Sequence, residues 1–379
     1  MKKRKKYSSI LLALVLFILC FVNSGNNAFA VNTDQAKPGL EVMFIDVGQG
    51  DAILISCDDH YMLIDGGTSD KSDLIYTVLK NKGITHLDAI AATHPHADHV
   101  GGLPGALAYA VCDVAYVPVA SYDNASFNKF KTSLQSKGVP LAVPETGSKI
   151  QLGSAVISVI GPTDIEPSMT PNDISLFFRL DYGNTSFLFA GDAEQQEQQL
   201  VMWNYYDLLD VDCLKAAHHG SYNGASSAFI QAVSPKITVV SCGAGNSYGH
   251  PHADALSLYK NSGSALYRTD MHGDIYVTSD GTQLYVTTEK QPQGDIWSSG
   301  NTFSSASGSS NSGSSSTGSL TTTNQAGKTD YVLNTHTGKF HLPSCSSVST
   351  IKESNKVYFT GTRDELINKG YSPCGRCHP

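Results

Sequence analysis

Residues 93–102 read Thr-His-Pro-His-Ala-Asp-His-Val-Gly-Gly and place four potential metal ligands within a few positions of one another. Side chains two residues apart share a face at the end of a strand, so His94 and His96 can bind one ion. If a helix begins near Asp98, then Asp98 and His99 project back toward a second ion. Imidazole and carboxylate groups suit zinc, and manganese or iron less exclusively. The segment therefore predicts a metal centre, against the alternative of a polar loop that happens to be rich in histidine.

Four further motifs stand in a fixed order around this cluster. Residues 44–55 read Phe-Ile-Asp-Val-Gly-Gln-Gly-Asp-Ala-Ile-Leu-Ile, and Leu-Ile-Asp-Gly-Gly occupies 63–67. Phe-Ala-Gly-Asp stands at 189–192, and Ala-His-His-Gly-Ser at 217–221. Together the motifs resemble the metallo-β-lactamase superfamily, and most closely its ComEC-like branch of competence proteins that process incoming DNA. The resemblance spans roughly residues 40–289.

This resemblance implies a fold and a set of ligands. The fold is an α/β metallo-β-lactamase αββα sandwich, in which helices flank two mixed β-sheets, with a site for one or two metal ions. In that superfamily the residue matching Asp192 bridges both ions. We expect His219 to bind the same ion as Asp98 and His99. His218 would then contact a substrate oxyanion, unless the roles of these two adjacent histidines are exchanged.

Two further residues are expected to support the chemistry. Asp65, in the 63–67 motif, is expected to orient a ligand histidine rather than to touch metal. His250, in Gly-His-Pro-His at 249–252, is our candidate for protonating a leaving group or binding phosphate. The alternative for His250 is a histidine near a helix start with no catalytic part.

One departure from the family pattern concerns the ion held by His94 and His96. Many superfamily members supply a further histidine to that ion from a loop before the bridging aspartate, but residues 100–191 contain no histidine. A polar segment lies there instead, at Asn172, Asp173 and Ser175. We therefore expect this ion to be more weakly bound, more hydrated, or manganese rather than zinc.

The expected chemistry is hydrolysis by a metal-activated hydroxide at a dinuclear site. Metal coordination lowers the pKa of water from near 16 to roughly 7, and paired ions stabilise the attacking and departing oxygens. Asp98 would orient that hydroxide. The ligands do not choose between phosphodiesters, lactones, thioesters and β-lactams, because loops around the pocket set the substrate.

The beginning of the chain predicts export. Residues 1–30 combine five basic residues, an apolar core and Ala28-Phe29-Ala30, which is the pattern of a signal peptide cleaved after Ala30. An uncleaved membrane anchor is the alternative. Nothing later in the sequence is apolar enough to cross a bilayer, so no transmembrane DNA-uptake channel is expected in this chain.

Apolar periodicity predicts that the hydrolase domain, residues 31–289, mixes strands with helices. We expect strands at 41–47, 52–57, 61–65, 87–92, 114–118, 155–160, 174–181, 185–190, 211–216, 237–241, 274–278 and 283–288, and helices at 72–82, 101–110, 126–137, 193–204, 225–233 and 253–262. The region carries a formal charge of about −16, which disfavours non-specific binding to a polyanion. Four cysteines lie in it without paired spacing and are expected to be buried free thiols, namely Cys57, Cys112, Cys213 and Cys242.

Residues 290–327 are rich in Ser, Gly and Thr and predict a flexible linker to a small domain at 328–379. That domain contains a set of one histidine and three cysteines that matches a structural zinc site: His341, Cys345, Cys374 and Cys377. A disulfide plus one free thiol is the alternative.

Residues 331–379 resemble the zinc-binding domain of Ada-type DNA alkylation-repair proteins. In that family the first ligand is a cysteine that accepts a methyl group, whereas this chain has His341, so methyl transfer is not expected. Residues 328–379 carry seven basic and four acidic side chains, which favours contact with DNA. A purely structural or protein-binding module is the alternative.

These features predict a secreted metal-dependent hydrolase with two Zn²⁺ or Mn²⁺ ions in its core and one structural Zn²⁺ in its tail. The favoured activity is that of a phosphodiesterase or nuclease, with DNA as a possible substrate recruited by the tail. The alternatives are a hydrolase of a lactone, thioester or β-lactam, or a DNA- or cell-surface-binding protein whose metal core is mainly structural.

Overall fold

The computed structural model describes residues 39–163, 165, 169–300 and, with short gaps, 329–377. The chain divides into two compact units, residues 1–308 and 309–379. The expected signal peptide and most of the expected linker lie outside the described residues. Among the described helices, none has both the length and the apolar character needed to span a membrane.

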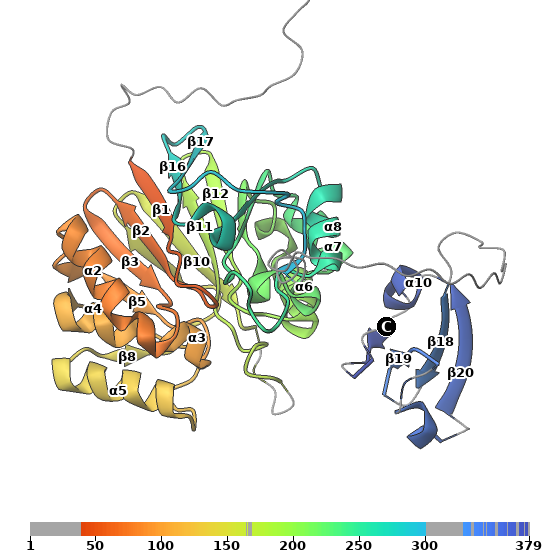
Figure 1. Cartoon of the computed structure of the whole chain (residues 1–379). Coiled ribbons are helices and arrows are strands. Elements are labelled where there is room, and N and C mark those ends of the chain that lie inside the picture. The colour runs from red at the N-terminus through yellow and green to blue at the C-terminus, as the bar shows by residue number, and fades with distance from the viewer. Residues whose placement is uncertain are drawn as a thin grey trace, which may run out of the picture. The chain divides into compact units, whose positions relative to one another are not determined.

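Two mixed β-sheets form the centre of the first unit (Figure 1). The strands of the eight-stranded sheet are β1 (Leu40–Phe44), β2 (Ile53–Cys57), β3 (His60–Ile64), β5 (Ala89–Ala91), β7 (Ala115–Tyr116), β8 (Leu141–Ala142), β16 (Ile275–Ser279) and β17 (Leu284–Thr288). Their order is β17-β16-β1-β2-β3-β5-β7-β8, antiparallel from β17 to β3 and parallel from β3 to β8.

The seven-stranded sheet has a similar mixture of directions. Its strands are β9 (Lys149–Leu152), β10 (Ala155–Gly161), β11 (Phe177–Tyr182), β12 (Thr185–Phe189), β13 (Cys213–Lys215), β14 (Ile237–Val240) and β15 (Ala265–Arg268). Their order is β15-β14-β13-β12-β11-β10-β9, parallel from β12 to β15 and antiparallel elsewhere. β4 (His86–Leu87) and β6 (Val111–Cys112) form a separate parallel pair.

Helices cover the outer faces of the two sheets (Figure 1). The first sheet is covered by α2 (Ser72–Lys82), α3 (Ala97–Val100), α4 (Leu103–Tyr109) and α5 (Ala125–Lys137), and the second by α6 (Gln195–Tyr205), α7 (Ser227–Val233) and α8 (Ala253–Asn261). A further short helix, α9 (Thr269–His272), follows β15. The unit is therefore an αββα sandwich, as the sequence predicts.

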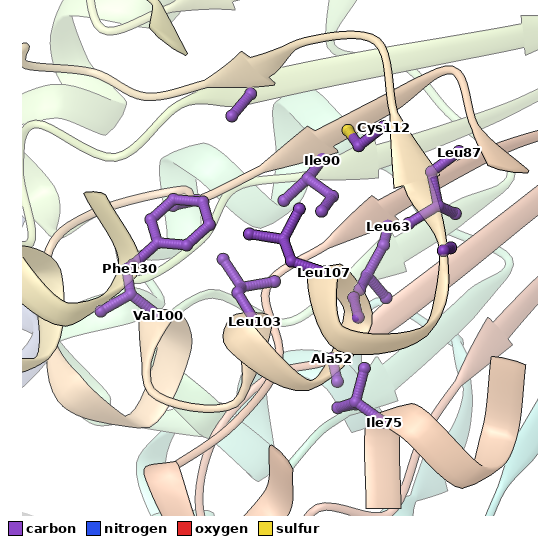
Figure 2. Packing of buried hydrophobic residues seen from close by; sticks show 14 of the residues in the cluster. Ala52, Leu63, Ile75, Leu87, Ile90, Val100, Leu103, Leu107, Cys112 and Phe130 are labelled. Carbon is purple, nitrogen blue, oxygen red and sulfur yellow. The ribbon is translucent and has the colours of Figure 1, made fainter. Parts of the chain in front are cut away.

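Three apolar clusters correspond to the three interfaces between these four layers. In β2, Leu54 faces the helices of the first layer, whereas Ile53 and Ile55 face the other sheet. Figure 2 shows the helix-facing cluster, where Leu103 and Leu107 of α4 pack beside Leu63 and Ile90 of the sheet. Because central strands bury both faces, they appear in the sequence as continuous apolar runs.

Most expected elements are present with small shifts at their ends. The helix expected at 72–82 has those bounds and ends at Gly83, whose φ of 69° gives a left-handed cap. The helix expected at 101–110 is instead α4, preceded by the separate turn α3. The sequence analysis missed β9, where exposed Lys149 and Gln151 interrupt the apolar pattern, and β15, which ends in the buried Arg268. It also missed β6 and β8, which are two residues long.

The second unit is small. Its described strands are β18 (Thr329–Asn334), β19 (Lys339–His341), β20 (Lys356–Gly361) and β21 (Ser372–Pro373), in the order β20-β18-β19-β21. The helix α10 (Arg363–Asn368) and a short 3-10 turn (Val348–Thr350) accompany them. Its buried apolar cluster consists of Tyr331, Leu333, Phe340 and Leu366. So small a core is typical of domains that depend on a metal or covalent cross-link.

Phe189→Ala tests the interface between the two large sheets. Phe189 of β12 is buried, and its ring lies 6.4 Å from that of Phe44 in β1, so the substitution leaves a cavity between the sheets. We expect it to lower the free energy of unfolding by about 3–5 kcal/mol, measured by tryptophan fluorescence in urea. Val111→Ala, at a 68% exposed position, serves as the control and should change it by less than about 0.5 kcal/mol. Equal effects of the two substitutions would contradict this interface.

Candidate metal centre

The 93–102 cluster comprises the loop that follows β5, the short helix α3 and the two glycines after it. Strand β5 ends at Ala91, earlier than expected, so His94 and His96 lie in the loop rather than on the strand itself. The loop still brings them together, with His94 Nε2 3.0 Å from His96 Nδ1. His96 is the extended residue before α3, and this helix presents Asp98 and His99 to the same region.

One carboxylate oxygen, Asp192 Oδ2, is the meeting point of four imidazoles. Asp192 follows β12, where Gly191 has a φ of 52° and turns the chain. The oxygen lies 3.2 Å from His99 Nε2, 3.3 Å from His219 Nε2, 3.8 Å from His218 Nε2 and 3.9 Å from His94 Nε2. This position agrees with the bridging role that the resemblance implies for Asp192.

Asp98 supplies a second carboxylate on the same side of these rings. Its Oδ2 lies 3.3 Å from His219 Nε2 and 4.0 Å from His99 Nε2. Burial alone would raise the pKa of Asp98, but the adjoining imidazole of His219 and the charge of His99 outweigh it and hold the pKa below its usual range. The grouping expected of Asp98, His99 and His219 is therefore present.

The far nitrogens of the buried His99 and His219 rings are fixed by protein oxygens. His99 Nδ1 lies 2.9 Å from Asp65 Oδ2, and Asp65 also accepts hydrogen bonds from the amide and hydroxyl of Thr93. His219 Nδ1 lies 3.0 Å from the carbonyl oxygen of Ser241. With the protons held at Nδ1, both rings direct Nε2 at Asp192. Asp65 thus lies where an orienting residue must lie.

The donor set fits a metal cation. Asp192 Oδ1, His99 Nε2 and His219 Nε2 are buried and have no hydrogen-bond partner among the described residues. Ligand atoms from Asp51, His99, Asp192 and His219 all lie within 4.8 Å of one another. Buried polar atoms without partners are costly, and a cation would satisfy them. Nitrogen and carboxylate ligands together suit zinc or manganese.

Asp51 is a residue that the sequence analysis missed. It is fully buried, pairs with the buried Lys215 of β13, and lies 3.3 Å from His219 Nδ1 and 3.8 Å from His99 Nδ1. Burial opposes its ionisation, but Lys215 and His219 lower its pKa overall. The signal in the sequence was the lysine inside the apolar strand Cys-Leu-Lys, since a buried lysine requires a partner.

The three polar residues expected near the missing histidine have three different contacts. Asn172 lines the pocket and donates from Nδ2 to Glu194 Oε1 at 3.0 Å. Asp173 Oδ1 accepts from the backbone amide of Glu194 at the start of α6, and Ser175 Oγ accepts from the amide of Asp192. Asn172 is therefore the member of this set that reaches the pocket.

A pocket of about 320 Å³ opens over the cluster. It is lined by Gln49, His96, Ala97, Asp98, Asn172, Asp192, His218, His219, Tyr248 and His250. His250 Nδ1 lies 3.4 Å from Gln49 Nε2, and the ring of Tyr248 stacks on His250 at 5.6 Å. Burial, followed by the charges of His219 and His218, lowers the pKa of His250 to about 3. Its proposed part in leaving-group protonation or phosphate binding stays a prediction.

The second unit contains the expected Cys3His group. Ligand atoms of these four residues lie within 4.8 Å of one another, and the group consists of His341, Cys345, Cys374 and Cys377. The amide of Leu342 donates to Cys377 Sγ, and that of Arg376 donates to Cys374 Sγ, each at 3.4 Å. Such contacts stabilise thiolates, so the group can hold a metal ion such as zinc.

The described cysteines are all free, which leaves the Cys3His thiols available to a metal. Four cysteines in the described part of the first unit are buried as expected, namely Cys57, Cys112, Cys213 and Cys242. Burial raises the pKa of Cys112 to about 11, so this thiol is inert near neutral pH.

Comparison with known proteins identifies the family. The sequence pattern described as "Metallo-beta-lactamase superfamily" matches residues 45–244, which include the clusters at 93–102 and 189–192 and His219. The chain belongs to this superfamily. Its αββα sandwich agrees with that assignment.

Similar proteins indicate which branch of the superfamily the chain resembles. ComE operon protein 3 of Bacillus subtilis is 30% identical over 253 residues, which are 62% of this chain and 32% of that protein. Competence protein ComA of Neisseria gonorrhoeae is 25% identical over 239 residues, 61% of this chain and 31% of that protein. The solved structure of the metallo-beta-lactamase fold protein YhfI from Bacillus subtilis is 14% identical, with a TM-score of 0.40, covering 65% of this chain and all of that one. The resemblance to ComEC-like proteins is confirmed, although the chain spans about a third of the length of these curated relatives.

Lys215→Met tests the buried Asp51–Lys215 pair. The substitution leaves Asp51 as an uncompensated buried charge, so we expect the metal-free protein to lose about 3–5 kcal/mol of unfolding free energy in urea. The double variant with Asp51→Asn removes that charge and should recover most of the loss. A single variant within about 1 kcal/mol of the wild type would contradict this account.

Cys374→Ser tests the metal group of the second unit in the full chain. We expect the protein to lose one equivalent of zinc by elemental analysis, and amide exchange in residues 329–343 to accelerate, because the small core cannot hold the fold alone. Lys339→Ala, at an exposed position of β19, should keep the full zinc content. Undiminished zinc in Cys374→Ser would show that the thiol is not a ligand.

Proposed function

We propose that this chain is a secreted metal-dependent phosphodiesterase, and more specifically a nuclease. The observation that carries the proposal is the gathering of His94, His99, His218 and His219 around Asp192 Oδ2, beneath an open pocket with further polar side chains. Phosphodiester hydrolysis needs an activated water, together with positive charge placed next to the attacking oxygen and next to the departing oxygen. A pair of cations in this cluster would meet that need.

The residues of the chain divide the work. When bound, the metal pair would supply an activated water and electrophilic charge at the phosphoryl oxygens. His94 and His96 would hold one ion, while Asp98, His99 and His219 would hold the other, with Asp192 between them. Asp98 faces the pocket and, as a carboxylate, can accept a hydrogen bond from the attacking water and so orient it.

Gln49 and His250 supply hydrogen-bonding groups to the same pocket. Their positions suit contact with a non-bridging phosphate oxygen. Tyr248, which is 64% exposed and stacked on His250, offers an aromatic face at the rim. Bases of single-stranded nucleic acid stack on such faces.

DNA as the substrate rests on two supports. The Neisseria gonorrhoeae relative is named a competence protein, and competence is a DNA-related process. The basic composition of residues 328–379 suits a polyanion. Because the first unit is acidic, we propose that the second unit recruits the substrate. Secretion rests on the pattern of residues 1–30, and N-terminal sequencing of protein recovered from the culture medium would test cleavage after Ala30.

The paired change His96→Ala with Asp98→Ala tests the activity. Purified protein with added Zn²⁺ or Mn²⁺ should cleave DNA and a bis-aryl phosphate. The double variant should lose at least about a thousandfold in turnover, because it lacks one ligand of each ion and Asp98 also orients the water. Exposed Lys339→Ala serves as the control for protein handling.

A panel of other substrates distinguishes the alternatives. Robust turnover of a lactone, thioester or β-lactam with inert phosphodiesters would overturn the proposal. Salt-sensitive DNA binding by the full chain without any hydrolysis would favour a binding protein whose metal core is structural.

A further inference from the structure

The ion assigned to His94 and His96 lacks the additional histidine that many superfamily members provide, since residues 100–191 contain none. The structure places another imidazole beside the same bridging oxygen. His218 Nε2 lies 3.8 Å from Asp192 Oδ2, almost the same distance as His94 Nε2 at 3.9 Å. His218 and His96 also line the same pocket, so His218 lies within reach of the incomplete half of the centre.

The surroundings of His218 repeat those of the other ligand rings. His99 and His219 each direct Nε2 at Asp192 while a protein oxygen faces Nδ1. In His218, Nδ1 lies 3.3 Å from Glu194 Oε1. A carboxylate behind an imidazole fixes its orientation and strengthens its second nitrogen as a metal ligand. Glu194 thus has the same relation to His218 as Asp65 has to His99.

Glu194 is itself held in place. Its Oε1 accepts from Asn172 Nδ2 at 3.0 Å and from Asn223 Nδ2 at 3.5 Å. The region where a histidine was expected therefore acts on the site indirectly. Asn172 fixes the carboxylate that faces His218.

The backbone turns both adjacent histidines inward. His218 has φ 49° and ψ 47°, and His219 has φ 54° and ψ 27°, so both adopt the left-handed region. Two such non-glycine residues in succession cost about 1–3 kcal/mol each, which the surrounding structure must offset. The amide of His218 donates to the carbonyl of Gly191 beside Asp192, which fixes the turn. Without this turn, neighbouring side chains would point to opposite sides.

We propose that His218 is the third imidazole ligand of the ion held by His94 and His96, with Glu194 as its positioning residue. The inference rests on the two-ion site of the proposed function. It replaces the expected oxyanion contact of His218, and it leaves Gln49 and His250 as the groups that contact substrate.

The matched variants His218→Asn and His219→Asn test this assignment, because asparagine tolerates the left-handed backbone better than most residues. The full-length wild type should bind three Zn²⁺ equivalents, one of them in the tail. Each variant should bind two of these ions as tightly as the wild type does. Its affinity for the third should fall at least about tenfold in calorimetric titration with Zn²⁺ alone. In Co²⁺-substituted protein, His218→Asn should also change the visible ligand-field spectrum of the ion held by His94 and His96.

Glu194→Gln separates positioning from ligation. It should keep all three ions but weaken one of them about 10–100-fold, and it decides the question if His218→Asn fails to fold. His250→Asn, which changes another imidazole of the pocket, should leave Zn²⁺ stoichiometry and affinity unchanged.

Two results would overturn the assignment: wild-type Zn²⁺ affinity in His218→Asn, or wild-type affinity in Glu194→Gln. Metal binding is measured without substrate, so the outcome is independent of the reaction catalysed. If wild-type protein cleaves no phosphodiester while His218→Asn still loses one ion, the proposed function fails and the ligand assignment stands.

Discussion

The structure depends on the burial of one carboxylate oxygen, Asp192 Oδ2, among imidazoles from separate parts of the chain. A group of this kind is stable only if each polar atom finds a partner, and the elements around it are arranged to provide those partners. Strand β12 is followed by a left-handed glycine before Asp192, strand β13 is followed by two left-handed histidines, and β5 is followed by the 93–102 segment. Each turn brings a ligand to the same edge of the sandwich.

This arrangement explains why the fold and much of the site could be predicted from the sequence. Strands buried on both faces gave long apolar runs, and Gly83 marked the end of α2, because these features depend on neighbouring residues alone. The clustered ligands at 93–102 were visible for the same reason. Their grouping with Asp192 and His219 followed from the family resemblance rather than from local pattern.

Other contacts could not be predicted because they join residues far apart in the chain. The Asp51–Lys215 pair and the Glu194–His218 pair each depend on how two elements pack, which local sequence does not specify. The missing histidine of residues 100–191 illustrates this limit. The sequence indicates that the ion at His94 and His96 is bound more weakly. The geometry, however, places His218 beside Asp192, where it can replace the missing histidine.

The buried Lys215 gives the centre a permanent internal counter-ion. Occupancy by metal ions depends on their concentration, whereas Lys215 is part of the chain. Asp51 therefore remains paired whichever ions are bound. Asp51 in turn lies against the Nδ1 atoms of His99 and His219, and the orientation of these rings is thereby less dependent on metal. A ligand cluster that contains its own cation, Lys215, can form during folding and bind metal afterwards. Metal binding then becomes a step separate from folding.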